Sequence, residues 1–233
     1  MPGPGPTADV LNAAPHSQNR SMGIVYAAFG WPVVFAVVRA WGRRDQSTSA
    51  KRVSAIHGIT TLGAAILYVA RRGTGPVRDD AWGTEPLADA ICDYSAGYML
   101  YDLVHVFTLK EHRMFLAHHV LSAVGLQSHR IVGAGSIVGV HNLLAAELGG
   151  LLFQLSRQYP RNPFYRVAFP LSMVATRLLY FPLISYWHML RIRKMRPTAP
   201  ELARLAGTVA AQGGVIAVNI GWLLKLVRTG RVL

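Results

Sequence analysis

The stretch DYSAGYMLYDLVH, from Asp93 to His105, indicates most clearly what kind of protein this is. It lies inside an apolar segment long enough to cross a bilayer, yet it carries two carboxylates, and a charged side chain at mid-bilayer costs about 2.5–3.5 kcal/mol. At about 100° per residue, its polar and aromatic side chains fall on one half of a helix, and Met99, Leu100, Leu103, Val106 and Phe107 fall on the other half. The stretch therefore predicts a membrane helix whose polar half lines an internal cavity while its apolar half faces lipid.

Composition supports a membrane protein. The chain has 233 residues, of which 52% are hydrophobic and 15% charged, whereas soluble domains carry about 25% charged residues. The net charge is +13, but the basic residues stand in short runs between apolar stretches, which fits anionic lipid headgroups rather than nucleic acid. One cysteine excludes an intramolecular disulfide. We expect neither a soluble enzyme nor a nucleic-acid-binding protein.

Seven stretches come close to the length of about 20 residues that crosses a hydrocarbon core. They are Met22–Trp41, Val53–Ala70, Leu87–Leu109, the shorter Met114–Gln127, Ile131–Leu155, Val167–Leu190 and Leu205–Val227. Residues 1–20, rich in Pro and Gly, are predicted to form a disordered arm, and residues 21–233 a single membrane domain. The predicted fold class is all-α: a transmembrane helical bundle of about seven spans that enclose a polar cavity.

Ionisable and polar residues occur in several of these spans. Four ionisable groups exposed to lipid would together cost roughly 10 kcal/mol, so we expect them to face one shared interior. The cavity-lining candidates are His57, Tyr98, Tyr101, His105, His141, Asn142, Glu147 and Arg177, beside Asp93, Asp102, His118 and His119. For Arg177 two interpretations stay open, pairing with Glu147 or extension toward the membrane surface. A single intramembrane histidine is more often a helix-to-helix hydrogen bond than a catalyst.

Three segments together resemble the TLC domain, which is shared by translocating-chain-associating membrane proteins, ceramide synthases and related proteins. The segments are Asp93–Asp102, the His118-His119 pair and Asn142–Glu147. The resemblance extends from about Ser54 to Val227 and includes His57 and Arg177. It implies a helical bundle around a lipid-accessible chamber, in the endoplasmic reticulum or another internal membrane.

In ceramide synthases the matching histidine pair supports acyl transfer from acyl-CoA to the amine of a sphingoid base. This chain departs from that pattern, because Asn142 follows His141 where the ceramide synthase motif has His-Asp, and Ala145 stands near the position of a further Asp. The chain is therefore more similar to the small TLC domain-containing proteins, the TLCD group. Members of that group are tied to membrane lipid composition.

These observations lead to a hypothesis of fatty-acyl transfer to a lipid amine or hydroxyl. His118 or His119 would act as the general base or accept the acyl group, and Asp93 or Asp102 would hold the imidazole in one tautomer. Acyl-CoA is the expected co-substrate, with no bound cofactor and no metal. The basic residues between Arg39 and Arg52 would receive its phosphates or form a belt against lipid headgroups.

Two alternatives remain. The first is a non-enzymatic lipid-binding protein that regulates membrane composition. The second is an accessory subunit of a larger membrane assembly, in which glycine-rich helix faces would pack against a partner. In each case we expect membrane lipids as partners and a monomer or homodimer as the basic unit.

Overall fold

A computed structural model describes residues 22–42, 45–72, 83–108, 113–132, 135–195 and 199–229. The predicted N-terminal arm, residues 1–20, lies outside this part of the chain. The described residues form helices without any strand. The helices are α2 (Met22–Gly42), α3 (Gln46–Arg72), α4 (Pro86–Thr108), α5 (Arg113–Val132), α6 (Ser136–Gln158), α7 (Pro163–Ser172), the π-helix η2 (Met173–Tyr180), α8 (Phe181–Met195) and α9 (Ala199–Thr229).

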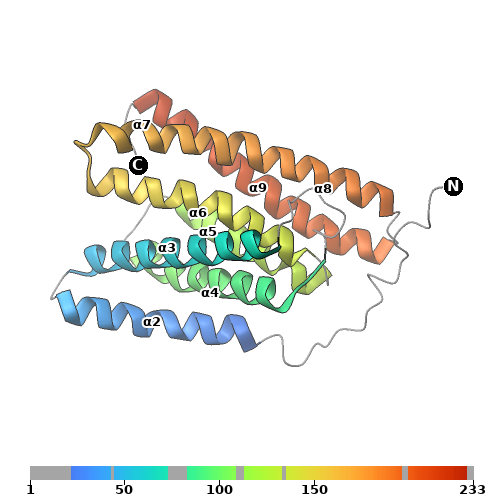
Figure 1. Ribbon diagram of the computed structural model, residues 1–233, viewed down its shortest axis with the longest axis horizontal. Helices are drawn as coiled ribbons and strands as arrows, with labels where there is room; N and C mark the ends of the chain where they lie inside the picture. Colours follow the sequence, from blue (N-terminus) through green and yellow to red (C-terminus); the bar gives the residue numbers. More distant parts are fainter. Residues whose placement is uncertain are drawn as a thin grey trace.

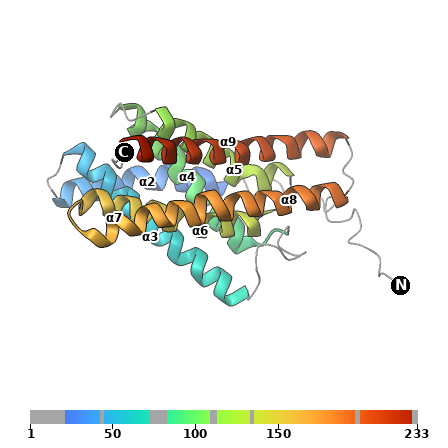
Figure 2. The same cartoon turned by 90° about the horizontal axis from the view of Figure 1, so that it is seen from above.

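The helices lie side by side along the long axis of the molecule, and α7, η2 and α8 follow one another as a single rod (Figure 1). The helix α4 packs against α2 and α5, α5 also packs against α9, and α3 packs against α6. Figure 2 shows the same bundle from above, with α9 and α8 running alongside each other. The predicted all-α bundle is confirmed.

Five helices are long and apolar enough to cross a membrane: α2, α3, α6, the rod of α7 to α8, and α9. The two others, α4 and α5, have 23 and 20 residues, a length that spans about 30 Å at 1.5 Å per residue. They carry most of the predicted polar site residues, which lowers their hydropathy. Their neighbours in the bundle cover those side chains.

The helix α4 is buried over more of its surface than the sequence pattern predicted. Leu100 and Phe107 are exposed, at 42% and 66%, as expected for a lipid-facing stripe. Met99 and Val106 were predicted on the same face, and this prediction is wrong, because both are buried and line a cavity. The reason is that α4 packs against both α2 and α5, which leaves only a narrow stripe uncovered.

The boundary between the fourth and fifth predicted spans is also corrected. We placed a polar linker after Gln127, but α5 continues through Arg130 to Val132. The next helix begins at Ser136, after Gly135, whose φ of 95° is a left-handed conformation that glycine adopts without strain. Arg130 is tolerated inside the helix because its guanidinium pairs with Asp93 of α4.

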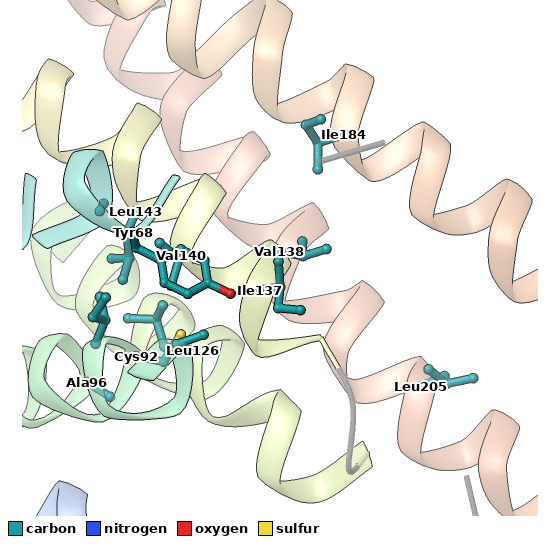
Figure 3. Close-up of a cluster of buried hydrophobic side chains, with 13 residues drawn as sticks. Tyr68, Cys92, Ala96, Leu126, Ile137, Val138, Val140, Leu143, Ile184 and Leu205 are labelled. Carbon is teal, nitrogen blue, oxygen red and sulfur yellow. The ribbon is translucent and has the colours of Figure 1, made fainter. Parts of the chain in front are cut away.

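The main hydrophobic core joins α3, α4, α5 and α6 at the end of the bundle where α6 begins. Figure 3 shows Tyr68, Cys92, Leu126 and Val140 gathered in this core. Ile184 of α8 and Leu205 of α9 belong to the same cluster but lie apart from that group in the figure. The outer helices therefore close the bundle through fewer buried side chains at this end.

The packing of α2 on α4 requires a glycine at position 97. A Cβ atom there would lie 2.5 Å from the Cβ of Ala27 and 2.8 Å from the backbone nitrogen of Ala28. Since backbone cannot move aside cheaply, we predict that Gly97→Ala lowers stability by about 1–3 kcal/mol, as overpacked cores do. The thermal midpoint of the detergent-purified protein measures this loss.

The matched control is Gly63→Ala in α3, where the added Cβ meets nothing within 4 Å. That change should leave the midpoint unchanged or raise it slightly, because alanine favours a helix over glycine by up to about 1 kcal/mol. Equal midpoints for the two variants would contradict the close approach of α2 to α4.

Candidate functional site

A large cavity opens at the end of the bundle where α3 begins and where α6 and α9 end, on the left in Figure 1. Its volume is about 1350 Å³, including the space at its mouth. Side chains from α3, α4, α5, α6, η2 and α9 form its wall. The predicted site residues among them are His57, Tyr98, Asp102, His105, His118, His119, Glu147 and Arg177.

His119 is hydrogen-bonded at both ring nitrogens. Its Nδ1 lies 2.7 Å from the carbonyl oxygen of Phe115, one turn earlier in α5, and its Nε2 lies 2.9 Å from Oδ2 of Asp102 on α4. A carbonyl only accepts hydrogen bonds, so Nδ1 carries a proton. A second proton must lie between Nε2 and the Asp102 carboxylate. In this geometry His119 has no free nitrogen to offer a substrate.

His118 differs from its neighbour because its Nδ1 is buried without a hydrogen-bond partner among the residues that the structure describes. Its ring packs against Trp222 of α9, with 5.0 Å between the ring centroids. The two histidine rings are nearly perpendicular, at 83°. Of the pair, His118 is therefore the imidazole that is free to accept a proton or an acyl group.

Glu147 of α6 is buried and lies opposite His57 of α3. Oε2 of Glu147 is 3.9 Å from Nδ1 of His57, which is too long for a hydrogen bond. His57 is fixed by other contacts, since its Nε2 lies 3.1 Å from Oγ of Ser95 and its ring stacks on Tyr98 with centroids 3.8 Å apart. Among the described residues, the carboxylate of Glu147 thus has no hydrogen-bond partner in the cavity wall.

Arg177 enters the site from the π-helix η2, a rare helix type that often marks functional sites. Its guanidinium donates to the carbonyl oxygen of Ala146 at 2.8 Å and to Oδ1 of Asn219 at 3.4 Å. It is only 5% exposed, so it does not extend to the membrane surface. In the described part of the chain it forms no ion pair with Glu147 or any other carboxylate, and its Nε has no acceptor.

A second cavity lies between α5, α6, α8 and α9, with a volume of about 1010 Å³ that includes the space at its mouth. It reaches toward the opposite end of the bundle, where Gly135 precedes α6 and where Thr208 lies in the first part of α9. The two cavities share five wall residues, which are Met99, His118, Ala146, Glu147 and Arg177. The cavities therefore follow one another along the bundle axis, and the polar groups stand where they meet.

A family model described as the TLC domain matches residues 49–228. The chain belongs to the TLC domain family. The matched range contains every histidine, carboxylate and arginine described above. No curated protein and no solved structure shows significant similarity to the chain. With five helices suited to crossing a membrane, this TLC domain protein is a multi-pass membrane protein of lipid metabolism or homeostasis.

Three predicted site residues lie elsewhere in this TLC domain protein. Asp93 was expected beside the histidine pair, but it lines neither cavity and instead binds Arg130 and, at 3.0 Å, Nε2 of Gln127. Tyr101 turns toward α2, where it packs against Phe35. His141 is buried at 2% exposure, and neither it nor Tyr101 lines a cavity. Tyr101 lies away from the cavity because the buried surface of α4 faces α2 as well as the cavity.

Some site residues were missed by the sequence analysis. Trp222 packs against His118, and Arg157 lines the first cavity together with Lys51. Arg157 lies just beyond the predicted fifth span, and a basic residue at the end of a membrane helix is too common to indicate a binding site. Of the predicted basic loop, Lys51 lines the cavity, Arg39 and Arg52 are exposed outside it, and residues 43–44 lie outside the described residues. In the described ranges, no three His, Cys, Asp or Glu side chains gather closely enough to hold a metal ion.

The pair of Asp93 and Arg130 predicts a specific stability pattern. Replacing Arg130 by Met leaves the Asp93 carboxylate, 6% exposed, without its cation, which typically costs about 3–5 kcal/mol. The double variant Asp93→Leu/Arg130→Met removes both charges and should recover much of this loss. Thermal unfolding in detergent measures both effects.

Arg113→Met serves as the control, because Arg113 is an exposed residue on the same helix. We expect it to change the midpoint little. If Arg130→Met behaved like Arg113→Met, the buried ion pair would contribute nothing and the assignment of Asp93 to a structural role would fail.

Proposed function

We propose that this TLC domain protein transfers a fatty-acyl group from acyl-CoA to an amine or hydroxyl group of a membrane lipid. One observation carries the proposal: His118, with a ring nitrogen that no described residue hydrogen-bonds, lines both cavities at the point where they meet. Two substrates that enter from the two cavities would meet at this imidazole. We further propose the endoplasmic reticulum or another internal membrane as the location.

In the proposed reaction, the acceptor oxygen or nitrogen attacks the thioester carbonyl and gives its proton to His118. The new C–O or C–N bond forms, the C–S bond breaks, and His118 returns the proton to the sulfur of CoA, so that the thiol leaves. Negative charge develops on the carbonyl oxygen during the attack. Arg177, buried in the shared wall and without a carboxylate partner in the described residues, is suited to stabilise that charge.

His119 and Asp102 have a positioning role in this proposal. Their hydrogen bond of 2.9 Å joins α5 to α4 and fixes the helix turn that presents His118. The sequence left both histidines as candidates for the base. The contacts of His119 with Phe115 and Asp102 favour His118, because a nitrogen that is already hydrogen-bonded must break that bond before it can serve.

The first cavity suits the CoA end of the donor. Lys51 of α3 and Arg157 of α6 line it near the end of the bundle, and phosphate groups are bound well by such cations. Neither forms an ion pair with a described carboxylate. Both charges thus remain available for an anionic ligand.

A non-enzymatic lipid-binding function is the second candidate. The favouring observation is that Asn142 and Ala145 stand where the ceramide synthase pattern has aspartates, which is also why we propose closer kinship with the TLCD group. In that case the cavities would hold a lipid without turnover. Activity measurements with purified protein separate the two candidates.

The central prediction concerns the two histidines. With labelled acyl-CoA and a panel of lipid amines and alcohols, His118→Ala should lose about 10²–10⁴-fold in kcat, the usual contribution of a general base. His119→Ala and Asp102→Asn should lose less, because their effect is indirect. Product formation by the protein in nanodiscs measures all three.

Val120→Ala is the matched control, since Val120 is the next residue of α5 and is exposed at 43%. It should retain wild-type turnover. If His118→Ala retained it as well, the catalytic assignment would be wrong and the lipid-binding candidate would stand.

A second prediction tests the cationic entrance. Lys51→Gln and Arg157→Gln should each raise KM for acyl-CoA about tenfold while kcat stays constant, because they remove binding that is equal in ground and transition states. Added salt should reduce the difference. Arg52→Gln, which removes an exposed charge next to Lys51, should leave KM unchanged. An equal effect of all three would indicate general surface charge instead of a binding site.

A further inference from the structure

The second cavity has a mixed wall that an ordinary acyl chain does not require. Most of it is apolar, with Leu121, Val138, Leu143 and Val215 among its side chains. Between them lie two amide side chains, Asn142 of α6 and Gln212 of α9. An apolar chain alone would leave these amides without partners.

Both amides carry a buried atom that lacks a hydrogen-bond partner within the described ranges. These atoms are Oδ1 of Asn142 and Nε2 of Gln212. Leaving a buried polar atom unsatisfied costs about as much as a lost hydrogen bond, so the pair is expensive to keep in an empty or purely aliphatic site. Oδ1 of Asn142 is an acceptor and Nε2 of Gln212 is a donor, and each amide side chain also carries the complementary group.

A hydroxyl group both donates and accepts, so its chemistry matches both the acceptor of Asn142 and the donor of Gln212. A carboxylate or an ammonium group fits less well. The charged residues of the wall, Glu147 and Arg177, belong to the junction with the first cavity. The deeper part of the second cavity therefore favours an uncharged hydrogen-bonding group.

The position of the amides along the bundle specifies where this group must lie on the ligand. Asn142 precedes Glu147 by five residues on α6, which is about 7.5 Å along the helix axis, and Gln212 precedes Asn219 by seven residues on α9, about 10 Å. The helices α6 and α9 run in the same direction (Figure 1). Both amides thus lie on the same side of the junction, several chain carbons away from His118.

We propose that the second cavity is a specificity site for an aliphatic chain that carries a hydroxyl group several carbons from its reacting end. Asn142 and Gln212 bind the hydroxyl, and the surrounding apolar side chains bind the chain. The proposal depends on the proposed acyl transfer in one respect only: the transfer determines which end of the aliphatic chain lies at His118. The binding preference itself requires no turnover.

The test compares stearate with a series of stearates whose hydroxyl is moved along the chain, as radiolabelled ligands for the full-length protein in nanodiscs. The wild-type protein should bind the best-placed hydroxystearate about tenfold more tightly than stearate, the gain expected from two net hydrogen bonds. The preference should depend on hydroxyl position. Equal affinity for stearate and every hydroxylated probe would overturn the proposal.

Variants on two separate helices locate the preference. Asn142→Leu and Gln212→Leu should each reduce the preference for hydroxystearate while stearate still binds. Gln212→Asn, which keeps an amide, should restore part of it. A preference that persists in both leucine variants would show that the hydroxyl is bound elsewhere and would contradict the assignment.

A plug variant tests whether the chain occupies this cavity at all. Gly125 lines the second cavity, and a Cβ there meets nothing within 4 Å, so Gly125→Leu should fill the space and weaken binding of every probe. Gly213→Leu is the matched control, because Gly213 is exposed on α9 and its added Cβ also meets nothing within 4 Å. Equal binding by the two variants would refute occupancy of the cavity.

The same probes separate this proposal from the proposed catalysis. His118→Ala should lose transfer and keep the hydroxyl preference. A wild-type protein that shows the preference but transfers no acyl group from acyl-CoA would refute acyl transfer alone. A protein that transfers acyl groups without any hydroxyl preference would refute the specificity site alone.

Discussion

The cost of placing charge in hydrocarbon organises this protein. The carboxylates of Asp93 and Asp102 in the bundle interior are each bound by a side chain of a neighbouring helix. The packing of these helices therefore depends on where the charges are placed. Asp93 binds Arg130 and thereby joins α4 to α5 at one level, and Asp102 binds His119 and joins the same helices at another. These two links align the polar faces of α4 and α5, the two helices that are not among the five described helices most suited to crossing a membrane. Of the two adjacent histidines, His119 is bound to Asp102, whereas Nδ1 of His118 has no hydrogen-bond partner among the described residues.

This alignment separates structural from chemical roles among similar residues. One aspartate is bound to an arginine outside the cavities and the other to a histidine inside the first cavity. Arg177 is likewise unlike Arg130, since its guanidinium binds a backbone carbonyl and an amide in place of a carboxylate. A buried cation with incomplete pairing, beside an unpaired imidazole, is costly for stability. Such a combination is expected where a ligand completes the contacts.

The sequence predicted the helical bundle because the length and apolarity of the spans are local properties. It also named most of the ionisable side chains that line the first cavity, since charged groups in several spans require a shared interior. It could not predict the partner of Asp93, because Arg130 stands beside Ser128 and His129 and resembles a loop until its contact with α4 is known. Nor could it distinguish His118 from His119. That distinction depends on the Phe115 carbonyl and on Trp222, which the fold brings together.

The π-helix η2 has one consequence for how the site tolerates changes in chain length. A π-helical turn holds about one more residue than the α-helical turn it replaces. Here the widened turn contains Arg177 and is followed directly by α8. Removing one residue would restore an ordinary helix and rotate everything on one side of it by about 100°. The guanidinium of Arg177 and the outer surface of α8 could then no longer keep their present orientations at the same time, so a deletion in this segment disturbs the site more than a substitution does.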